Sequence, residues 1–467
     1  MKRSKRVFDK SKVNIFPFFV LIAVIAICYI GYIQFFNTPK FRLNSDDQIS
    51  TAGFSAQIDS ENVLIKSIEI FLIVENDKTF MIYSKDEFDD SKSTHDIDVG
   101  FNENSEFIKY IKKAKDTELT LSYNIQYRNK FFNSELNDSY LISVDFKPPE
   151  ISNIETDGYV YLGGIGYIKL KSSLDVSKLY LDNGNGDLFY PISNKKNDSM
   201  EHLIFFTCSN KPCKDNGVKI YAEDFAKNST VVFRKIRTIK NKKWPEYLIK
   251  IDRKSFTDKY NEILNSNIEM IDKNDFLRIN KVERALNESK IKKITTNINP
   301  KKYFNGSFNQ LANSKVSSKF SEKRRYYFSD SEDEIIDIQL HWGYDLSSIQ
   351  NAEVFAANSG IVVNVDNALG IYGSVVIIDH GLGFYSLYSH LNNIYVKKGD
   401  LVDKSTLIGL TGTSGMAFGD HLHLGIYLQG VPIDPVEFWD SKYMNLKIDE
   451  PYEAFSSKSS EVNNWKW

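Results

Sequence analysis

His341-Trp342-Gly343-Tyr344-Asp345 and Asp420-His421-Leu422-His423 begin and end the segment from which the rest of this chain can be interpreted. Leu387-Tyr388-Ser389-His390-Leu391 lies between them, and the segment contains five of the seven histidines in the 467 residues. Imidazole and carboxylate groups are common protein ligands of zinc. Two short clusters of these groups in a histidine-poor chain therefore predict a metal site.

The spacing within each motif is compatible with side chains that converge on one point. Alternate residues of a strand point to the same face, so His421 and His423 can reach one site, one binding metal and the other facing substrate or water. His341 and Asp345 suit a strand end and the loop after it, and Gly343 would let the backbone turn tightly between them. Three ligands of this kind leave a coordination position open for water, as in catalytic zinc sites.

Each motif alone is weak evidence, because His-x-His often belongs to a satisfied core strand. Their occurrence together with His390 favours a site. Short apolar stretches punctuated by glycines follow from about Phe304 and predict an all-β domain. His95 and His202 stand apart and are interpreted as ordinary surface or core histidines.

Four motifs of this domain together resemble the motif series of the lysostaphin-type, or LytM-like, zinc metallopeptidases, which cut peptidoglycan cross-bridges and stem peptides. The resemblance covers residues 304–440. The motifs are His341-Trp-Gly-Tyr-Asp345, Tyr388-Ser-His390-Leu391, Gly412-Thr-Ser-Gly415 and Gly419-Asp-His421-Leu-His423.

The resemblance implies that His341, Asp345 and His423 hold one zinc ion and that His390 and His421 are the two catalytic histidines. It also implies an all-β LytM-type fold, a duplicated hybrid motif, with the metal on the floor of a groove. Because these residues already fill the zinc-binding and catalytic positions, His380 has no role in the chemistry and is interpreted as structural.

The composition limits the other classes of function. Lys and Arg number 59 against 61 Asp and Glu, so the chain lacks the basic excess of a nucleic-acid-binding protein. A chain of this length predicts about two to four domains.

The N-terminus predicts a membrane anchor. Residues 15–36 contain no charged side chain and are long enough to span a bilayer as a helix. Basic residues dominate positions 1–14, which predicts a cytoplasmic tail, a single pass through the bacterial inner membrane and an extracytoplasmic catalytic domain. A cleaved signal peptide and lipidation at Cys28 are the alternatives.

The remaining chain predicts a mainly β protein. Residues 40–147 form a β-rich domain, because stretches such as 119–127 alternate strictly between apolar and polar residues. Pro148-Pro149 marks a boundary, and the short strands of residues 148–240 predict an immunoglobulin-like β-sandwich. Residues 250–300 are a helical linker, and 441–467 a C-terminal tail.

The helical linker shows apolar residues at helical spacing. Phe256, Tyr260, Ile263 and Leu264 predict a first helix, and a stripe of Phe276, Ile279, Val282 and Leu286 predicts a second. Such stripes are packing surfaces, so this part is interpreted as a stalk or brace without chemistry.

Two further features have more than one interpretation. Cys208 and Cys213 flank a short loop and could form a disulfide, remain free thiols or supply half of a zinc site. Arg324 and Arg325 could contact an acidic wall peptide or form an ordinary salt-bridged surface pair.

Together these features predict a membrane-anchored zinc endopeptidase that hydrolyses peptide bonds of peptidoglycan outside the cytoplasmic membrane, with peptidoglycan peptides and the inner membrane as its partners and no nucleic acid. One alternative is a non-catalytic scaffold of the same fold that activates other wall hydrolases, although the complete ligand set favours the enzyme. Another is a secreted peptidase that acts on proteins.

Overall fold

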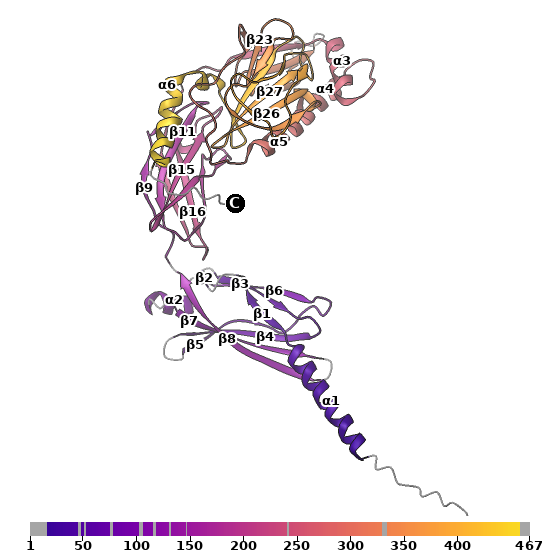
Figure 1. Ribbon diagram of the computed structural model, residues 1–467, viewed down its shortest axis with the longest axis vertical. Coiled ribbons are helices and arrows are strands. Elements are labelled where there is room, and N and C mark those ends of the chain that lie inside the picture. The colour runs from indigo at the N-terminus through magenta and orange to yellow at the C-terminus, as the bar shows by residue number, and fades with distance from the viewer. Residues whose placement is uncertain are drawn as a thin grey trace, which may run out of the picture. The chain divides into compact units, whose positions relative to one another are not determined.

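The protein is mainly β and forms two compact units, Met1–Pro148 with Asp224–Asn228, and Pro149–Glu223 with Ser229–Trp467 (Figure 1). The computed structural model describes residues 16–44, 48–50, 53–74, 78–101, 106–114, 118–129, 132–145, 147–240, 242–328 and 334–457. The predicted cytoplasmic tail, residues 1–14, lies outside the described residues.

The first unit is built on one eight-stranded sheet. The predicted strand at 119–127 is confirmed, because the alternate residues of β7 from Leu119 to Tyr127 are buried. The strands follow the order β1-β3-β2-β8-β7-β4-β5, with β6 beside β3. They are β1 (Lys40–Leu43), β2 (Gln48–Ser50), β3 (Gly53–Asp59), β4 (Leu64–Val74), β5 (Lys78–Lys85), β6 (Thr94–Gly100), β7 (Glu118–Arg128) and β8 (Asn133–Asp145), and helix α2 (Glu106–Ala114) shares their apolar core.

The predicted membrane anchor forms helix α1 (Phe16–Phe36). The structure describes the side chains of residues 20–32 of this helix. Among the residues that are described, no helix is long and apolar enough to cross a membrane, so the predicted transmembrane helix and inner-membrane partner have no support from the structure.

The second unit begins with two four-stranded sheets that share one apolar core. The first has the order β14-β15-β11-β9 and the second β13-β12-β16-β17. A disulfide joins Cys208 and Cys213 directly after β15. The strands are β9 (Ile151–Glu155), β11 (Ile165–Ser172), β12 (Val176–Asp182), β13 (Leu188–Phe189), β14 (Ile192–Lys196), β15 (Ser199–Thr207), β16 (Gly217–Asp224) and β17 (Ser229–Lys235), and a short parallel pair joins β10 (Tyr159–Tyr161) to β18 (Arg237–Ile239).

The C-terminal part of this unit contains an eight-stranded antiparallel sheet in the order β20-β23-β31-β27-β26-β25-β29, with β32 beside β31. A second sheet has the order β24-β30-β28. The strands are β20 (Lys315–Ser318), β23 (Tyr344–Ser347), β24 (Glu353–Phe355), β25 (Gly360–Asp366), β26 (Ser374–Gly381), β27 (Phe384–Leu391), β28 (Asn393–Ile394), β29 (Leu401–Val402), β30 (Leu407–Leu410), β31 (Leu422–Leu428) and β32 (Val431–Ile433). Every residue of β27 and β31 is buried, because both faces of the large sheet are covered.

One face of the large sheet packs against the sandwich. The rings of Phe205 and Phe384 lie 5.4 Å apart, and the side chain of Gln429 forms hydrogen bonds of 2.8 and 3.0 Å with the backbone of Tyr190. Residues after 440, predicted as a tail, form α6 (Ser441–Met444), a π-helical turn (Asn445–Asp449) and α7 (Glu450–Ser456). The hydroxyl of Tyr443 accepts a 2.6 Å hydrogen bond from the backbone of Ile165, so these helices also bind to the sandwich.

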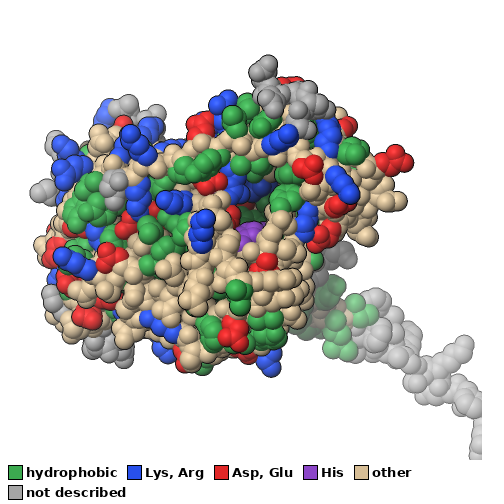
Figure 2. Space-filling model, turned by 90° about the horizontal axis from the view of Figure 1, so that it is seen from above, with side chains coloured by type: hydrophobic (Ala, Val, Ile, Leu, Met, Phe, Trp, Pro, Cys, Tyr) green, Lys and Arg blue, Asp and Glu red, His purple; other side chains and the backbone are tan. Residues whose placement is uncertain are grey.

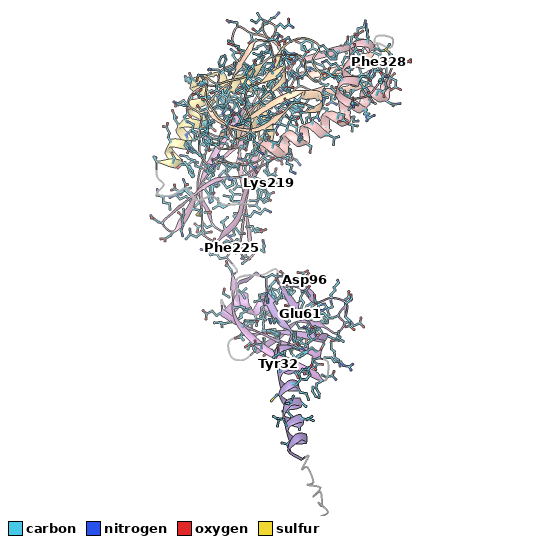
Figure 3. All side chains as sticks on the ribbon, turned by 45° about the vertical axis from the view of Figure 1, so that its right-hand side comes forward. Tyr32, Glu61, Asp96, Lys219, Phe225 and Phe328 are labelled. Atoms are coloured by element: carbon cyan, nitrogen blue, oxygen red, sulfur yellow. A yellow bond between two sulfur atoms is a disulfide. The ribbon has the colours of Figure 1, made fainter. Side chains whose placement is uncertain are left out.

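The other face is covered by the predicted helical linker, which comprises α3 (Arg253–Leu264), α4 (Lys273–Leu277), a π-helical turn (Arg278–Glu283) and α5 (Arg284–Thr295) (Figure 1). Apolar residues of these helices share a core with β26 and β27. A three-stranded sheet contributes to the same core. Its strands are β19 (Glu246–Ile251), β21 (Lys323–Phe328) and β22 (Asp337–Leu340). The guanidinium of Arg253 lies 3.8 Å from the ring centre of Phe328, which Figure 3 labels.

The predicted stripe on the second helix is only partly correct. Phe276 and Ile279 are fully buried, but Val282 and Leu286 are 53% and 59% exposed. The π-helical turn between Arg278 and Glu283 adds a residue to one turn and therefore rotates the following residues around the helix axis. Asn287, Ile291 and Thr295 face the core instead.

Candidate active site

Three side chains converge at one end of the large sheet. His341 follows β22, Asp345 lies in β23 and His423 lies in β31. Asp345 and His423 are direct partners across the antiparallel pair β23–β31, which brings their side chains together. His341 Nε2, Asp345 Oδ1 and His423 Nδ1 form a triangle with sides of 3.0, 2.9 and 2.9 Å.

This triangle has the dimensions of a metal site. Ligand atoms about 2.0 to 2.1 Å from a tetrahedral zinc ion are about 3.3 Å apart. Without a cation between them, two imidazole nitrogens and a carboxylate oxygen would direct lone pairs at one another in a buried site. These three residues could therefore hold a metal ion.

A backbone oxygen from the turn before β21 and a side chain of β21 itself orient two of these side chains. His341 Nδ1 donates a 2.9 Å hydrogen bond to the backbone oxygen of Lys319, which leaves the Nε2 lone pair directed at the triangle. Arg324 donates to Asp345 Oδ2 at 3.0 Å, so that the Oδ1 atom faces the triangle, and its Nε donates to Glu322 at 3.0 Å.

The two interpretations of the arginine pair from the sequence do not describe Arg324. Its side chain is only 22% exposed and is held between two carboxylates beside the triangle, so it is neither a surface pair nor free to meet a peptide. Arg325 does form an ion pair with Glu246 at the surface, at 3.4 Å.

Gly343 is required for a different reason from the predicted tight turn. A Cβ atom at this position would lie 2.6 Å from the backbone oxygen of Leu424 and 2.7 Å from the Nε2 atom of His423. The close approach of the His423 ring therefore excludes any side chain here.

His390 and His421 lie beside the triangle, as expected from the positions of their motifs. Their ring centres are 4.8 Å apart, and His421 Nε2 lies 3.7 Å from Asp345 Oδ1. His390 Nδ1 donates to the backbone oxygen of Ser414 at 2.8 Å, and His421 Nδ1 donates to that of Gly419 at 2.7 Å. In both rings, the Nε2 atom is thus the nitrogen that can accept a proton.

The loop that bears Ser414 is held close to Gly373. Gly373 has a φ of +66°, and a Cβ atom there would lie 2.4 Å from the Ser414 Oγ and carbonyl carbon atoms. A glycine at this position therefore lets the loop approach closely enough to orient His390.

Burial favours the neutral forms of His341, His390 and His423. It lowers the pKa of His423 to about 4 and also lowers the pKa of His341. The pKa of His390 lies well below its ordinary value because of burial and the nearby His421 and His423 rings. Burial would raise the pKa of Asp345, but the adjacent His341 and His423 hold it well below its usual range. Neutral imidazoles and an ionised carboxylate are the protonation states that bind metal.

The five side chains lie in a cleft of about 480 Å³. Figure 2 shows histidine side chains at the bottom of a hollow, with lysine and arginine side chains around its margin. The opposite wall includes residues of β19, which no motif of the sequence indicated, and residues of α3 and of the helical turns around residue 280, which were predicted only as packing surfaces. The lining includes Ile249, Lys250, Phe256, Asn280, Arg284, Tyr326 and Tyr372.

His380 is not part of the cleft lining. Its ring nitrogens meet the backbone oxygen of Ser359 at 2.8 Å and the hydroxyl of Ser386 at 2.6 Å, and its ring packs against Phe308. These contacts agree with the structural interpretation. Lys319, Glu322 and the cleft wall were missed, and the role of Arg324 beside Asp345 was not predicted, because no local pattern links these residues to the histidine motifs.

The fold and the site agree with the comparison against known families. Residues 339–435 match Peptidase family M23. The C-terminal part of the chain is an M23, LytM-type, peptidase domain, as the motif series predicted.

Individual relatives resemble the same part of the chain. An uncharacterized metalloprotease of Haemophilus influenzae is 33% identical over 122 residues, which is 26% of this chain and 24% of that protein. The peptidoglycan DD-endopeptidase ShyA of Vibrio cholerae is 30% identical over 123 residues, covering 26% of this chain and 27% of ShyA. The chain thus spans about a quarter of the length of these relatives.

Among solved structures, a zinc-containing peptidase from Vibrio cholerae is similar with 15% identity and a TM-score of 0.26. The similarity covers 68% of this chain and 80% of that one.

Proposed function

We propose that this protein is a zinc-dependent endopeptidase that hydrolyses peptide bonds of peptidoglycan. The observation that carries the proposal is the triangle of His341, Asp345 and His423, with sides of 2.9 to 3.0 Å, beside two further histidines in an open cleft. Relatives of the M23 domain include a peptidoglycan endopeptidase, which supports the substrate class.

In this proposal, His341 Nε2, Asp345 Oδ1 and His423 Nδ1 hold the zinc ion. Zinc in such a site polarises the scissile carbonyl and lowers the pKa of water. Arg324 and the Lys319 carbonyl keep the Asp345 and His341 side chains oriented for binding.

His390 and His421 move the protons. The hydrolysis forms a bond between water oxygen and the carbonyl carbon and breaks the bond between that carbon and the amide nitrogen. One Nε2 atom takes the proton of the water and delivers it to the leaving amine, and the second imidazole supports the charge that develops on the carbonyl oxygen. Both Nδ1 atoms are committed to backbone oxygens, which keeps each Nε2 facing the cleft.

The proposal places this reaction outside the cytoplasm, where peptidoglycan is found. The disulfide between Cys208 and Cys213 supports this location, because disulfides persist in oxidising compartments.

Digestion of purified peptidoglycan by the full-length chain tests the proposal, with released muropeptides identified by mass spectrometry. We expect hydrolysis that stops with a chelator and returns with zinc. His421→Ala should retain zinc but lose about 10²- to 10⁴-fold in rate, because only proton transfer is removed.

Three results would contradict the proposal. Hydrolysis that survives complete removal of metal would exclude the zinc mechanism. A zinc-loaded chain that releases no muropeptides would favour the scaffold, and one that cleaves casein but not peptidoglycan would favour a protein peptidase.

A further inference from the structure

The cleft wall opposite the histidines contains two cations without an ion pair. Lys250 of β19 and Arg284 of α5 both line the cleft, and among the described residues no carboxylate lies within 4.0 Å of either charged group. Arg324, in the same cleft, is instead neutralised by Glu322 and Asp345. Each cation does lie in the electrostatic field of a carboxylate, Lys250 in that of Asp252 and Arg284 in that of the partly buried Glu288, but no described carboxylate forms an ion pair with either of them.

Arg284 is held in a fixed orientation. Its Nε donates to the backbone oxygen of Asn280 at 3.0 Å and its Nη2 to the Oδ1 atom of Asn280 at 2.8 Å. Asn280 is 2% exposed, and its Nδ2 donates to Asp337 at 2.8 Å. These bonds occupy one edge of the guanidinium and leave Nη1 without a hydrogen-bond partner among the described residues. A guanidinium ordered in this way loses little conformational entropy when it binds an anion.

The π-helical turn places this arginine in the cleft. Without the extra residue, the predicted stripe would turn Val282 and Leu286 inward. In the structure these two side chains are exposed, and Asn280, Arg284 and Asn287 follow one another along the inward face. π-Helical turns are frequent at functional sites.

The position of Arg284 relates it to the candidate metal site. Tyr372 lies in the same cleft and packs edge-on against His423, with ring centres 5.8 Å apart. Glu288, one turn further along α5, is half-buried; burial raises the pKa of its carboxyl group, and the charge of Arg284 opposes this shift without an ion pair between the two. Arg284 and the histidines line the same cleft, so a group bound to Arg284 would occupy this cleft together with a peptide bond held at the histidines.

We propose that Arg284 binds a free carboxylate of the substrate, with Lys250 as a second cation at the cleft margin. This proposal rests on the proposed function, because peptidoglycan peptides combine cleavable amide bonds with free carboxylates close by. The arginine would select acidic wall peptides over neutral ones, since a planar guanidinium matches a carboxylate in shape and charge.

Paired substrates test this assignment. A cross-linked muropeptide and the same compound with its free carboxyl groups converted to carboxamides would be given to the full-length chain. We expect wild-type kcat/KM to be about 10- to 100-fold higher for the acid form. Arg284→Gln should lose this preference by slowing only with the acid form, mainly through KM, and should keep its zinc content.

Two further variants serve as controls. Arg284→Lys retains the charge without the planar fork and should keep part of the preference. Lys281→Gln removes a cation from an exposed position one turn away and should behave as wild type. Equal losses on both substrates in Arg284→Gln, or a wild-type chain that does not discriminate, would overturn the assignment.

A binding measurement separates this assignment from the proposed function. His421→Ala would be titrated with the two muropeptides by calorimetry, with and without Arg284→Gln. A preference for the acid form that requires Arg284 supports the carboxylate site even if wild type hydrolyses neither compound. Hydrolysis without any acid preference would reject the carboxylate site and leave the peptidase intact.

Discussion

His202 in the sandwich and His423 in the cleft are similarly buried, with 3% and 4% of their surfaces exposed, but their nitrogens meet different partners. His202 Nε2 lies 2.8 Å from the hydroxyl of Ser172, and Nδ1 lies 2.7 Å from that of Ser193. A serine hydroxyl can donate or accept, so both ring nitrogens are satisfied within the protein. His423 Nδ1 instead faces another imidazole nitrogen and a carboxylate oxygen at 2.9 Å.

This difference separates a structural histidine from a candidate ligand. Burial lowers the pKa of both, to about 3 for His202 and about 4 for His423, so neutrality does not distinguish them. The distinguishing feature is that acceptors converge in the cleft without enough protons between them. His380 belongs with His202, because its partners are a carbonyl oxygen and a hydroxyl.

The largest effect expected from this comparison is on catalysis. His423→Ala removes one corner of the triangle and should reduce peptidoglycan hydrolysis by about 10³-fold or more, since the polarising ion would be lost. Rates of muropeptide release, with circular dichroism to verify folding, provide the measurement. Activity within tenfold of wild type in a folded variant would remove His423 from the site.

The reverse behaviour is expected in the sandwich. His202→Ala leaves the buried Ser193 hydroxyl without this partner, removes one of the two partners of the Ser172 hydroxyl and creates a cavity, so it should lower the free energy of unfolding by about 3 kcal/mol. The rate of hydrolysis by the folded protein should be unchanged. Hydrogen exchange of β11 and β15 would report the lost stability, and unchanged protection would show that the serine contacts contribute little.

Arg324 and Arg325 sharpen the comparison within one strand. Arg324→Gln leaves Asp345 and Glu322 without their cation and should weaken zinc binding by about 10- to 100-fold, as changes behind metal ligands commonly do. Arg325→Gln, which affects only the 40% exposed pair with Glu246, is the matched control. Competition with a zinc indicator would measure both, and equal affinities would show that Arg324 does not orient Asp345.

The smallest effect concerns pH. The pKa of His202 is lowered by burial from 6.5 to about 3, so below pH 6.5 the unfolded state takes up a proton that the folded state does not. This contribution to stability is complete above pH 6.5 and decreases on acidification by about 1.4 kcal/mol per unit, until the folded state also titrates near pH 3.

His202→Gln tests that slope, because glutamine can hydrogen bond to both serines but does not titrate. The sandwich of wild type should lose protection from hydrogen exchange between pH 6.5 and pH 5 faster than that of the variant. Parallel pH profiles would show that another group is responsible for the acid sensitivity.

The sequence predicted the residues of the site better than their surroundings. The histidine motifs pointed to His341, Asp345, His390, His421 and His423, which the structure brings into one cleft, because strand alternation and motif spacing are local properties. Their orientation depends on Lys319 and Arg324, which contact them only after β21 and β23 have folded into neighbouring positions. No periodicity in the sequence encodes such a contact.

The fold was predicted to a similar extent. The mainly β class is confirmed, whereas the helical segment interpreted as a stalk or brace covers the large sheet and forms a cleft wall. Helical periodicity indicated which residues are apolar but could not reveal the π-helical turn that exposes Val282 and Leu286. That turn depends on packing against β26 and β27, which is a tertiary effect.

The central claim is that the convergence of acceptor atoms, and not the burial of histidines, defines the site. Zinc content after dialysis is the most direct test of this claim. Wild type and His202→Gln should each retain one zinc ion per chain, and His423→Ala should retain none. A His423→Ala chain that keeps its zinc, or a wild-type chain that binds none at micromolar concentrations, would contradict the account.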